Sequence, residues 1–370
     1  MEFLRFGVVG VNGMGGGHLR TLAQNLPYAK LTAICDTNLD IANKRKEELG
    51  LDVPVFQDFE DMLANADIDA VTLATPHYLH APHAILAANA GKHILTEKPL
   101  AISVSEGDAM IAAAKKNGVL LGVGHQRRWS GAMRGMRDLI KSGKLGAPMR
   151  SAYNTANQRN EHYYASGTWR GRWDQEGGGQ LINQQVHDMD ALCYMLGKPV
   201  EVMAWAENWA HKHEVDDVSM AIVKFDSGWT GTINISLSSV GGWGPSLIAY
   251  EGDLGVISNG KVAMRSEGCR DFIATSTTEK PSLSEFEDIP PVEMDIEGRD
   301  RYYRDMLESV NTGAPFEGSG EECIHAVELV NAIFLSALTG RRVQCPLDRG
   351  EVDDMFAELR EKETVLARVR

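Results

Sequence analysis

Three consecutive residues, Glu97, Lys98 and Pro99, are the first whose types suggest chemistry. They directly follow an apolar stretch, residues 93–96, that is typical of a buried strand. In open sheets of parallel strands, ligands bind beyond the carboxyl ends of the strands, which is where this lysine would lie. Because proline disfavours helical geometry at the preceding residue, we expect Lys98 to be held in an extended or turn conformation. Its ammonium group could then hold or relay a proton, although a glutamate–lysine pair at a strand end is also common in surface salt bridges.

A second polar cluster lies near the middle of the chain, where the glycines at 177–179 precede a helical pattern. Asn183 and His187 are four positions apart, and Asp190 follows three positions later. A single helix over residues 181–196 would therefore carry all three side chains on one face. Histidine is the natural proton acceptor for a secondary alcohol at neutral pH, and Asn183 could hydrogen-bond a hydroxyl or orient the ring. The alternative is a structural histidine, with Asp190 paired to a backbone group.

Upstream of this cluster, the chain offers aromatic rings and a guanidinium group. Such side chains suit a polyhydroxylated ring, but each could equally be an ordinary packing residue. The four candidates are Tyr163, Tyr164, Trp169 and Arg170.

A glycine turn near the N-terminus, GVNGMG at residues 10–15, follows the first predicted strand and opens a helix. This is the context of a dinucleotide-binding fingerprint, in which the N–H groups of the helix start neutralise a pyrophosphate. Asn12 stands where the second glycine belongs, and asparagine tolerates left-handed backbone better than most residues. A plain glycine-rich turn is the alternative. The predicted cofactor contacts here are Gly10, Asn12, Gly13, Met14 and Gly15.

Asp36 closes the second predicted strand about 20 residues after this turn, where an acidic side chain accepts hydrogen bonds from the adenosine ribose hydroxyls. Its carboxylate would repel a 2′-phosphate, and the next residues, Thr37 and Asn38, offer no arginine to bind one. The sequence therefore favours NAD over NADP. A helix-capping or turn aspartate is the alternative reading of Asp36.

The elements that must position these residues fall into two groups. Over residues 3–122, short β-branched runs alternate with amphipathic helical patterns, which predicts a doubly wound α/β Rossmann domain with a parallel sheet over residues 1–125. Alternating strands joined by hairpin turns at 226–228 and 259–260 then predict an α+β domain with an open, mainly antiparallel sheet over residues 126–370.

Helical patterns return near the C-terminus, and these helices can pack back on the first domain. They span residues 299–311, 320–338 and 352–368, while residues 275–291, rich in Ser, Thr, Glu and Pro, are predicted to form a long surface loop.

Composition excludes several classes of function. A formal charge of -14 argues against a nucleic-acid partner, which usually requires a concentrated basic face. The five cysteines lie far apart without metal-ligand spacing, so we expect reduced thiols and no metal site. The N-terminus lacks the apolar core of a signal peptide, and we find no run of about 18 apolar residues. We therefore expect a soluble cytoplasmic protein without a membrane partner.

Together these stretches resemble the glucose-fructose oxidoreductase and inositol dehydrogenase family, often written Gfo/Idh/MocA. The likeness covers nearly the whole chain, and the order and separation of its lysine and histidine elements are specific. Besides the glycine turn, the matching motifs are LATPHYLH (73–80), LTEKPLA (95–101), GVGHQRRW (122–129), WRGRW (169–173), GGGQLINQQVHDMD (177–190) and VDD (215–217).

The resemblance implies that hydride passes from a ring carbon to a nicotinamide while His187 takes the hydroxyl proton, assisted by Lys98. Asn183 stands where many members carry an aspartate that assists the histidine, so we include it in the catalytic set and read the change as a shift in substrate subgroup. The same match implies that Thr75, Pro76 and His80 line the nicotinamide side, that Glu97 and Lys98 touch the cofactor, and that Gln126 lies near its carboxamide. The implied substrate contacts are Lys98, Tyr163, Tyr164, Trp169, Arg170, Asn183 and His187.

We therefore predict an NAD-dependent dehydrogenase acting on a secondary hydroxyl of a pyranose sugar or glycoside, at carbon 3 in one subgroup, or of an inositol. The resemblance implies a homodimer or homotetramer formed through the C-terminal sheet. Two alternatives stay open: a glycosidase that uses bound NAD by oxidation and elimination, and a non-catalytic NAD-binding redox sensor.

Overall fold

The computed structural model describes residues 1–239, 246–275, 277 and 282–361, and the chain forms two compact units. Unit 1 comprises Met1–Trp129 with Asp295–Val327, and unit 2 comprises Ser130–Met294 with Glu328–Arg370. This division differs from the continuous predicted ranges 1–125 and 126–370, because a segment near the C-terminus belongs to unit 1.

Unit 1 contains a six-stranded parallel sheet in the order β3-β2-β1-β4-β5-β6, which confirms the predicted doubly wound fold. The strand order reverses between β1 and β4, and in open α/β sheets this switch point is where ligands bind. The strands are β1 (Leu4–Val9), β2 (Ala29–Cys35), β3 (Val55–Phe56), β4 (Ala70–Leu73), β5 (His93–Thr96) and β6 (Leu121–Val123). The helices are α1 (Met14–Leu22), α2 (Leu39–Glu48), α3 (Phe59–Asn65), α4 (His80–Asn89) and α5 (Val104–Asn117), with short 3-10 turns at His77–Leu79 and Gln126–Trp129.

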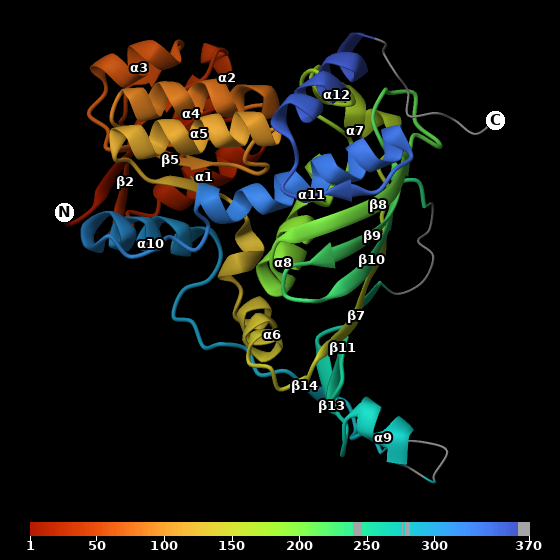
Figure 1. The fold of residues 1–370 in the computed structure, drawn as a ribbon. Helices are drawn as coiled ribbons and strands as arrows, with labels where there is room; N and C mark the ends of the chain where they lie inside the picture. Colours follow the sequence, from red (N-terminus) through yellow and green to blue (C-terminus); the bar gives the residue numbers. More distant parts are fainter. Residues whose placement is uncertain (240–245, 276, 278–281, 362–370) are drawn as a thin grey trace. The chain divides into compact units, whose positions relative to one another are not determined.

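Helix α10 (Arg299–Thr312) is the late segment that returns to unit 1. It lies on the side of the sheet opposite to α4 and α5 (Figure 1). Its Tyr303 packs edge-on against Phe6 of β1, with ring centroids 4.8 Å apart, and Met306 joins the same buried cluster. Trp129 bonds to the helix through Nε1, which donates to Asp305 at 2.9 Å. The Rossmann core is therefore completed by residues that lie far along the chain.

Unit 2 is built on a nine-stranded sheet in the order β14-β13-β12-β11-β7-β10-β9-β8-β15. Only β7 and β10 pair in parallel among its described strands, so the sheet is mixed and mostly antiparallel, as predicted. The strands are β7 (Pro148–Ala156), β8 (Pro199–Glu207), β9 (Val218–Phe225), β10 (Thr230–Ser236), β11 (Leu247–Gly252), β12 (Gly255–Ser258), β13 (Lys261–Met264), β14 (Glu287–Asp288) and β15 (Val343–Gln344). The helices are α6 (Gly131–Lys141), α7 (Glu161–Ala165), α8 (Val186–Leu196), α9 (Cys269–Thr275) and α12 (Arg349–Glu361), and α11 (Gly320–Thr339) crosses the division between the units.

The two predicted hairpin turns occur where expected. Gly228 takes a φ of 91° between β9 and β10, and Asn259 and Gly260 take φ of 47° and 82° between β12 and β13. These positive φ values are the ones that such tight turns require. The predicted loop over 275–291 is wrong in part, because Glu287 and Asp288 pair with β13; residues 276 and 278–281 lie outside the described part.

One face of this sheet is covered and the other is open. Along β9 the side chains alternate strictly, so that Ala221 and Val223 are buried while Met220 and Ile222 are about half exposed. This is the pattern of an antiparallel sheet with a single buried face. The open face carries large apolar side chains, which also include Trp205 of β8.

Helix α11 is, among the described residues, the one helix long and apolar enough to cross a membrane by composition. However, 72% of its apolar window is buried within the protein, which is what a core helix also shows.

If α10 completes the core of unit 1, replacing Met306 with alanine will destabilise the protein. Met306 has no exposed surface, and removal of a fully buried methionine side chain costs about 2–5 kcal/mol. Urea unfolding measures this loss. Glu308→Ala, an exposed change in the same helix, is the control and should stay within about 0.5 kcal/mol of wild type. Equal unfolding midpoints for the two variants would contradict the placement of α10 in this core.

Candidate functional site

The glycine turn joins β1 to α1, and its glycines allow backbone segments to lie closer together than any side chain would permit. A side chain at Gly10 would meet the carbonyl oxygen of Ala74 at 2.8 Å, and one at Gly15 would lie 1.7 Å from the carbonyl oxygen of Gly10. Gly13 takes a φ of 49° and caps α1 without a side-chain hydrogen bond, so the first N–H groups of the helix have no side-chain cap. The turn therefore has the shape and the donors of a phosphate-binding helix start.

Asn12 does not need the left-handed conformation considered for it, because Gly13 takes the positive φ instead. The Asn12 side chain is exposed, and its Oδ1 accepts a hydrogen bond from the N–H of Gly13 at 3.0 Å. The departure from the usual glycine is thus accommodated by the local backbone.

Asp36 lies at the carboxyl end of β2, where its carboxylate accepts two backbone hydrogen bonds. Val11 N–H donates to Oδ2 and Asn38 N–H to Oδ1, each at 2.9 Å. Asp36 therefore does stabilise the local turn, as the alternative interpretation proposed. This does not exclude hydrogen bonds from the same carboxylate to the ribose of a cofactor. A carboxylate has about four acceptor positions, so two remain for ribose hydroxyls.

Lys98 follows β5 directly, and its neighbour Glu97 is held in a buried hydrogen-bonded chain. The Oε1 atom of Glu97 lies 2.8 Å from Nε2 of His18 on α1, and the other ring nitrogen of His18 lies 2.7 Å from the hydroxyl of Tyr303 on α10. The hydroxyl of Tyr303 in turn lies 3.3 Å from that of Thr72. The N–H of Lys98 itself donates to Oε2 of Glu97 at 3.3 Å.

Burial by itself would raise the pKa of Glu97, but the hydrogen bond from His18 and the positive charges of Lys98 and Arg299 outweigh it, so the pKa lies below its usual range. Burial lowers the pKa of His18. A neutral His18 that donates from Nε2 and accepts at Nδ1 satisfies every partner in this chain. Glu97 is therefore a buried anion beside Lys98, and its oxygens are already bonded to protein groups.

His80 ties together the two segments that follow β4 and β5. Its Nδ1 lies 2.7 Å from the carbonyl oxygen of Pro99, and its Nε2 lies 3.0 Å from that of Thr75. The ring has no exposed surface. The structure thus favours a positioning role for His80 over the direct cofactor contact that was predicted. Pro99, joined to Lys98 by a cis peptide bond, is held directly by this ring.

Other predicted cofactor residues lie at the same edge of the sheet. Thr75 and Pro76 follow β4, and the buried Oγ1 of Thr75 has no hydrogen-bond partner among the described residues. Gln126 begins the 3-10 turn after β6 and is exposed. An unsatisfied buried hydroxyl, the uncapped start of α1 and the spare acceptor positions of Asp36 are all features that fit a dinucleotide.

In unit 2, the helix predicted over 181–196 is broken. A π-helical segment, Gln180–Gln184, precedes α8, in which Gln185 N–H bonds to the carbonyl of Gln180. Asn183 lies in the first piece, so the prediction that it shares one α-helical face with the other two is wrong, whereas His187 and Asp190 do both lie in α8, three positions apart. A π-helical turn carries an extra residue, which rotates the following side chains relative to a regular α-helix.

A compact polar cluster forms around the hydroxyl of Tyr163 on α7. Gln184 Nε2 donates to it at 2.6 Å and Asn183 Nδ2 at 3.3 Å, and Arg170 also bonds to it. The guanidinium of Arg170 lies over the rings of Tyr163 and Trp169, 4.4 Å and 4.6 Å from their centroids. Four predicted substrate residues therefore do lie together.

Tyr164 is a packing residue, which contradicts its predicted contact with substrate. Its ring is buried, with its centroid 4.0 Å from that of His213 and 5.1 Å from that of His211. Burial raises the pKa of its hydroxyl.

The VDD motif positions this cluster through two buried aspartates. Asp216 accepts hydrogen bonds from the N–H groups of Gly179 at 2.7 Å and Leu181 at 3.0 Å, and thereby fixes the turn before Asn183. Burial raises the pKa of Asp216 to about 6, although these two bonds oppose the rise. A side chain at Gly179 would lie 2.3 Å from the carbonyl oxygen of Asp216, so this position is restricted to glycine.

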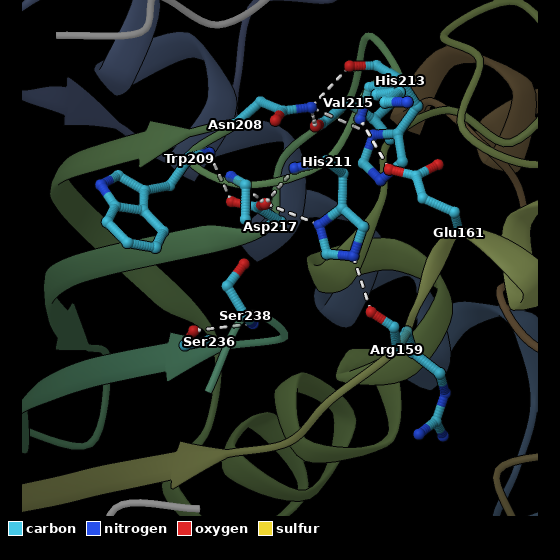
Figure 2. A network of polar contacts seen from close by, with 12 residues as sticks. Arg159, Glu161, Asn208, Trp209, His211, His213, Val215, Asp217, Ser236 and Ser238 are labelled. Atoms are coloured by element: carbon cyan, nitrogen blue, oxygen red, sulfur yellow. Dashed lines mark hydrogen bonds and ion pairs between the residues drawn. The ribbon is translucent and has the colours of Figure 1, made fainter. Parts of the chain in front are cut away.

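Asp217 anchors the loop after β8, as Figure 2 shows. Its carboxylate accepts from the N–H groups of Trp209 and Ala210, at 2.7 Å and 2.9 Å, and from Nδ1 of His211 at 2.7 Å. The other ring nitrogen of His211 lies 2.7 Å from the carbonyl oxygen of Arg159. Burial opposes both charges, but this pairing lowers the pKa of Asp217 to about 2 and raises that of His211.

Sequence reasoning missed four residues that build these sites. His18 and Tyr303 hold Glu97, and Glu176 and Arg159 bond to Asn183 and Gln184. Glu176 had no signal of its own in the sequence, because the burial of the glycines that follow it is visible only in the structure. Tyr303 had none, because its partners lie more than 200 positions away.

Comparison with known proteins gives two family matches. Residues 4–125 match the profile of an oxidoreductase family with an NAD-binding Rossmann fold, and residues 133–258 match the GFO/IDH/MocA C-terminal domain.

Individual relatives agree with these matches. A 1,5-anhydro-D-fructose reductase from Ensifer adhaerens is 36% identical over 171 residues, which are 46% of this chain and 50% of the reductase. The scyllo-inositol 2-dehydrogenase (NAD(+)) of Bacillus subtilis is 30% identical over 241 residues, which are 64% of this chain and 68% of that enzyme. The matches thus span about half to two thirds of the length of these curated relatives. The crystal structure of the WlbA dehydrogenase from Bordetella pertussis in complex with NADH and UDP-GlcNAcA is 27% identical, with a TM-score of 0.79 over 94% of this chain and 100% of that one.

Replacing Asp36 with asparagine should weaken NADH binding about tenfold, because one charged hydrogen bond to the ribose contributes on the order of 1.5 kcal/mol. NADPH binding should improve, since the repulsion of its 2′-phosphate disappears. Fluorescence titration with both cofactors measures this. Asp40→Asn, an exposed change in the first turn of α2, is the control. Tighter binding of NADPH than NADH by the wild type would contradict the role given to Asp36.

Replacing Asp217 with asparagine should cost on the order of 3 kcal/mol near pH 5, because it leaves His211 without its buried counter-charge. The pKa of Asp217 is depressed, so its contribution is present above 3.8 and is lost as pH falls towards about 2. The pKa of His211 is raised, so its contribution is present below 6.5 and is lost as pH rises through the folded value. Urea unfolding across this range should show the largest difference from wild type between those limits. A difference that is constant with pH would contradict this assignment.

Proposed function

Because the chain belongs to the GFO/IDH/MocA oxidoreductase family, we propose that it is an NAD-dependent dehydrogenase acting on a secondary hydroxyl of a pyranose sugar, a glycoside or an inositol. Unit 1 is an NAD-binding Rossmann domain. The observation that carries the proposal is the anchoring of Lys98, whose backbone N–H bonds to a buried carboxylate on one side and whose following residue is held by His80 on the other. A surface lysine that only made the protein more soluble would not need its backbone held by either of these two contacts.

The proposed roles follow from the chemistry of each side chain. Bound NAD supplies the acceptor for the hydride. His187 takes the proton of the hydroxyl, since an imidazole side chain is the natural general base for a secondary alcohol. Lys98 assists with its ammonium group, and the buried anion Glu97 next to it favours the charged form. Asn183, Tyr163 and Arg170 bind the remaining hydroxyls.

The substrate class is supported by what the relatives act on or bind. The two curated relatives reported above carry the names of an anhydrofructose reductase and a scyllo-inositol dehydrogenase, and the WlbA dehydrogenase was crystallised with a nucleotide sugar. All three ligands are polyhydroxylated rings. Oxidation at carbon 3 of such a ring is one subgroup within this proposal.

Assembly and location are further parts of this proposal. The open sheet face with Trp205, Met220 and Ile222 supports a homodimer or homotetramer, because a large exposed apolar patch usually marks an interface. We also propose a cytoplasmic location, with no nucleic-acid or membrane partner and no metal.

Replacing Lys98 or His187 with alanine should each lower kcat/KM by about 10²-fold or more, because proton transfer by a positioned side chain contributes about 10²–10⁴-fold. NADH affinity should change little in His187→Ala. The absorbance of reduced nicotinamide, followed with a panel of sugars, glycosides and inositols, measures turnover.

Exposed residues of the same types provide the matched controls, Lys116→Ala in α5 and His162→Ala in α7, both of which should keep wild-type rates. Wild-type rates in Lys98→Ala and His187→Ala would overturn the assignment. Release of an aglycone without net NADH would instead identify a glycosidase.

A further inference from the structure

His211 is a buried histidine in the loop after β8 that no predicted role covers (Figure 2). Its Nδ1 lies 2.7 Å from Oδ2 of Asp217, and its Nε2 lies 2.7 Å from the carbonyl oxygen of Arg159. Both partners can only accept, because Asp217 is an ionised carboxylate that also accepts the N–H groups of Trp209 and Ala210. A neutral imidazole has one N–H group, so both hydrogen bonds form only when the ring is the imidazolium cation.

The groups that face His211 favour this cation. Burial by itself would lower the pKa of the ring, but its two hydrogen bonds and the charges of Asp217 and Glu161 raise it above the usual value. His213 stacks on it with ring centroids 4.8 Å apart, and burial and the charge of His211 lower the pKa of His213 to about 4. The phenol of Tyr164 packs against both rings and stays neutral, because burial raises its pKa. The stacked pair therefore carries one positive charge, which lies on His211.

The bond to the carbonyl of Arg159 fixes the start of α7, the helix that carries Tyr163. This carbonyl belongs to the peptide unit that leads into Asn160, the N-cap of α7, whose Oδ1 accepts the N–H of Tyr163 at 3.1 Å. The same loop makes a second contact with α7 through the N–H of Lys212, which donates to Glu161 at 3.0 Å. Five residues are too few to form a stable helix alone, so the position of α7 depends on such contacts.

We propose that His211 is a positioning residue for the substrate, which holds the start of α7 as a cation and releases it as a neutral ring. When the ring loses a proton to solvent, the remaining N–H stays with Asp217, because an ionised carboxylate is a stronger acceptor than a carbonyl. The bare Nε2 then faces the carbonyl oxygen of Arg159, and no hydrogen bond joins two acceptors. This inference rests on the proposed function, in which Tyr163 binds a hydroxyl, and adds a control of that contact by pH.

The direction of the pH dependence follows from the sign of the shift. Because the pKa of His211 is raised, the bond to Arg159 is complete below 6.5 and is lost as pH rises through the folded value. The KM for the substrate should therefore rise about fivefold on the alkaline side, which is the scale of one lost hydrogen bond. NADH affinity should not follow this change, because none of the predicted cofactor contacts lies in α7.

Two substitutions of His211 separate its two hydrogen bonds. The amide nitrogen of asparagine is as many bonds from Cβ as Nδ1 of histidine, and that of glutamine is as many as Nε2. His211→Gln can therefore donate to the carbonyl of Arg159 at every pH, so its KM should stay low where that of the wild type rises. His211→Asn keeps a donor for Asp217 alone, so its KM should be about fivefold higher than that of the wild type at neutral pH and independent of pH. If the two variants show the same dependence of KM on pH, His211 does not act through Arg159.

Hydrogen exchange measured by mass spectrometry tests the hold on α7 without any substrate. The N–H groups of Tyr163 and Ser166 bond to carbonyls of Asn160 and Tyr163. After correction for the intrinsic effect of pH, their protection should fall several-fold between about pH 6 and about pH 9 in the wild type but not in His211→Gln. Helix α8 is the internal reference and should keep its protection. Constant protection of α7 across this range in the wild type would overturn the proposal.

His162→Gln and His162→Asn are the matched controls, because they make the same changes at an exposed histidine of α7. Their Tm, their dependence of KM on pH and the exchange of α7 should equal those of the wild type. Unchanged NADH binding shows that each variant is folded. The exchange measurement uses no substrate, so an enzyme that turned over none of the candidate sugars would end the proposed function while the hold of His211 on α7 was still decided.

Discussion

The backbone hydrogen bonds of one buried ring, His80, set the geometry on which unit 1 depends. Its two nitrogens lie 2.7 Å and 3.0 Å from carbonyl oxygens that follow β5 and β4, away from solvent, and because burial lowers the pKa of the ring, the neutral imidazole donates to one of these carbonyls. Loops normally move because their backbone groups exchange with water. The loop after β5 loses that freedom, because the carbonyl of Pro99 contacts a buried side chain. We therefore expect the backbone of Lys98 to move little.

Unit 2 achieves a comparable result with carboxylates. Asp216 holds the backbone before Asn183, and Asp217 holds the loop after β8 and, through His211, the backbone of Arg159. Glu176 holds the side chain of Asn183. Burying three carboxylates is expensive, and a well-packed apolar set would often be more stable. What the carboxylates provide is a fixed hydrogen-bond direction, because an ionised carboxylate only accepts and its neighbours must therefore donate to it.

Local patterns in the sequence predicted the parallel sheet, the hairpin turns and the glycine turn, since periodicity and turn chemistry act over a few residues. They failed where partners are distant. The return of a C-terminal helix to the first domain was predicted, but the contact of Tyr303 with Phe6 was not, nor was the burial of Tyr164 against His213. The prediction that Asn183 and His187 share one helical face failed for a local reason. A π-helical turn leaves their separation in the sequence unchanged but alters the rotation of the side chains about the helix axis. The polarity of the amides was not predictable from residue type, since asparagine and glutamine present a donor or an acceptor according to their surroundings.

The place of α10 has a consequence for how the protein is made. Synthesis proceeds from the N-terminus, and domains usually begin to fold as they leave the ribosome. Here the first unit lacks Tyr302, Tyr303, Met306 and Phe316 of its buried cluster until residues 130–294 have emerged. Residues 130–294 are thus inserted within the first unit, and the nucleotide-binding unit completes its core only after this inserted segment has been synthesised.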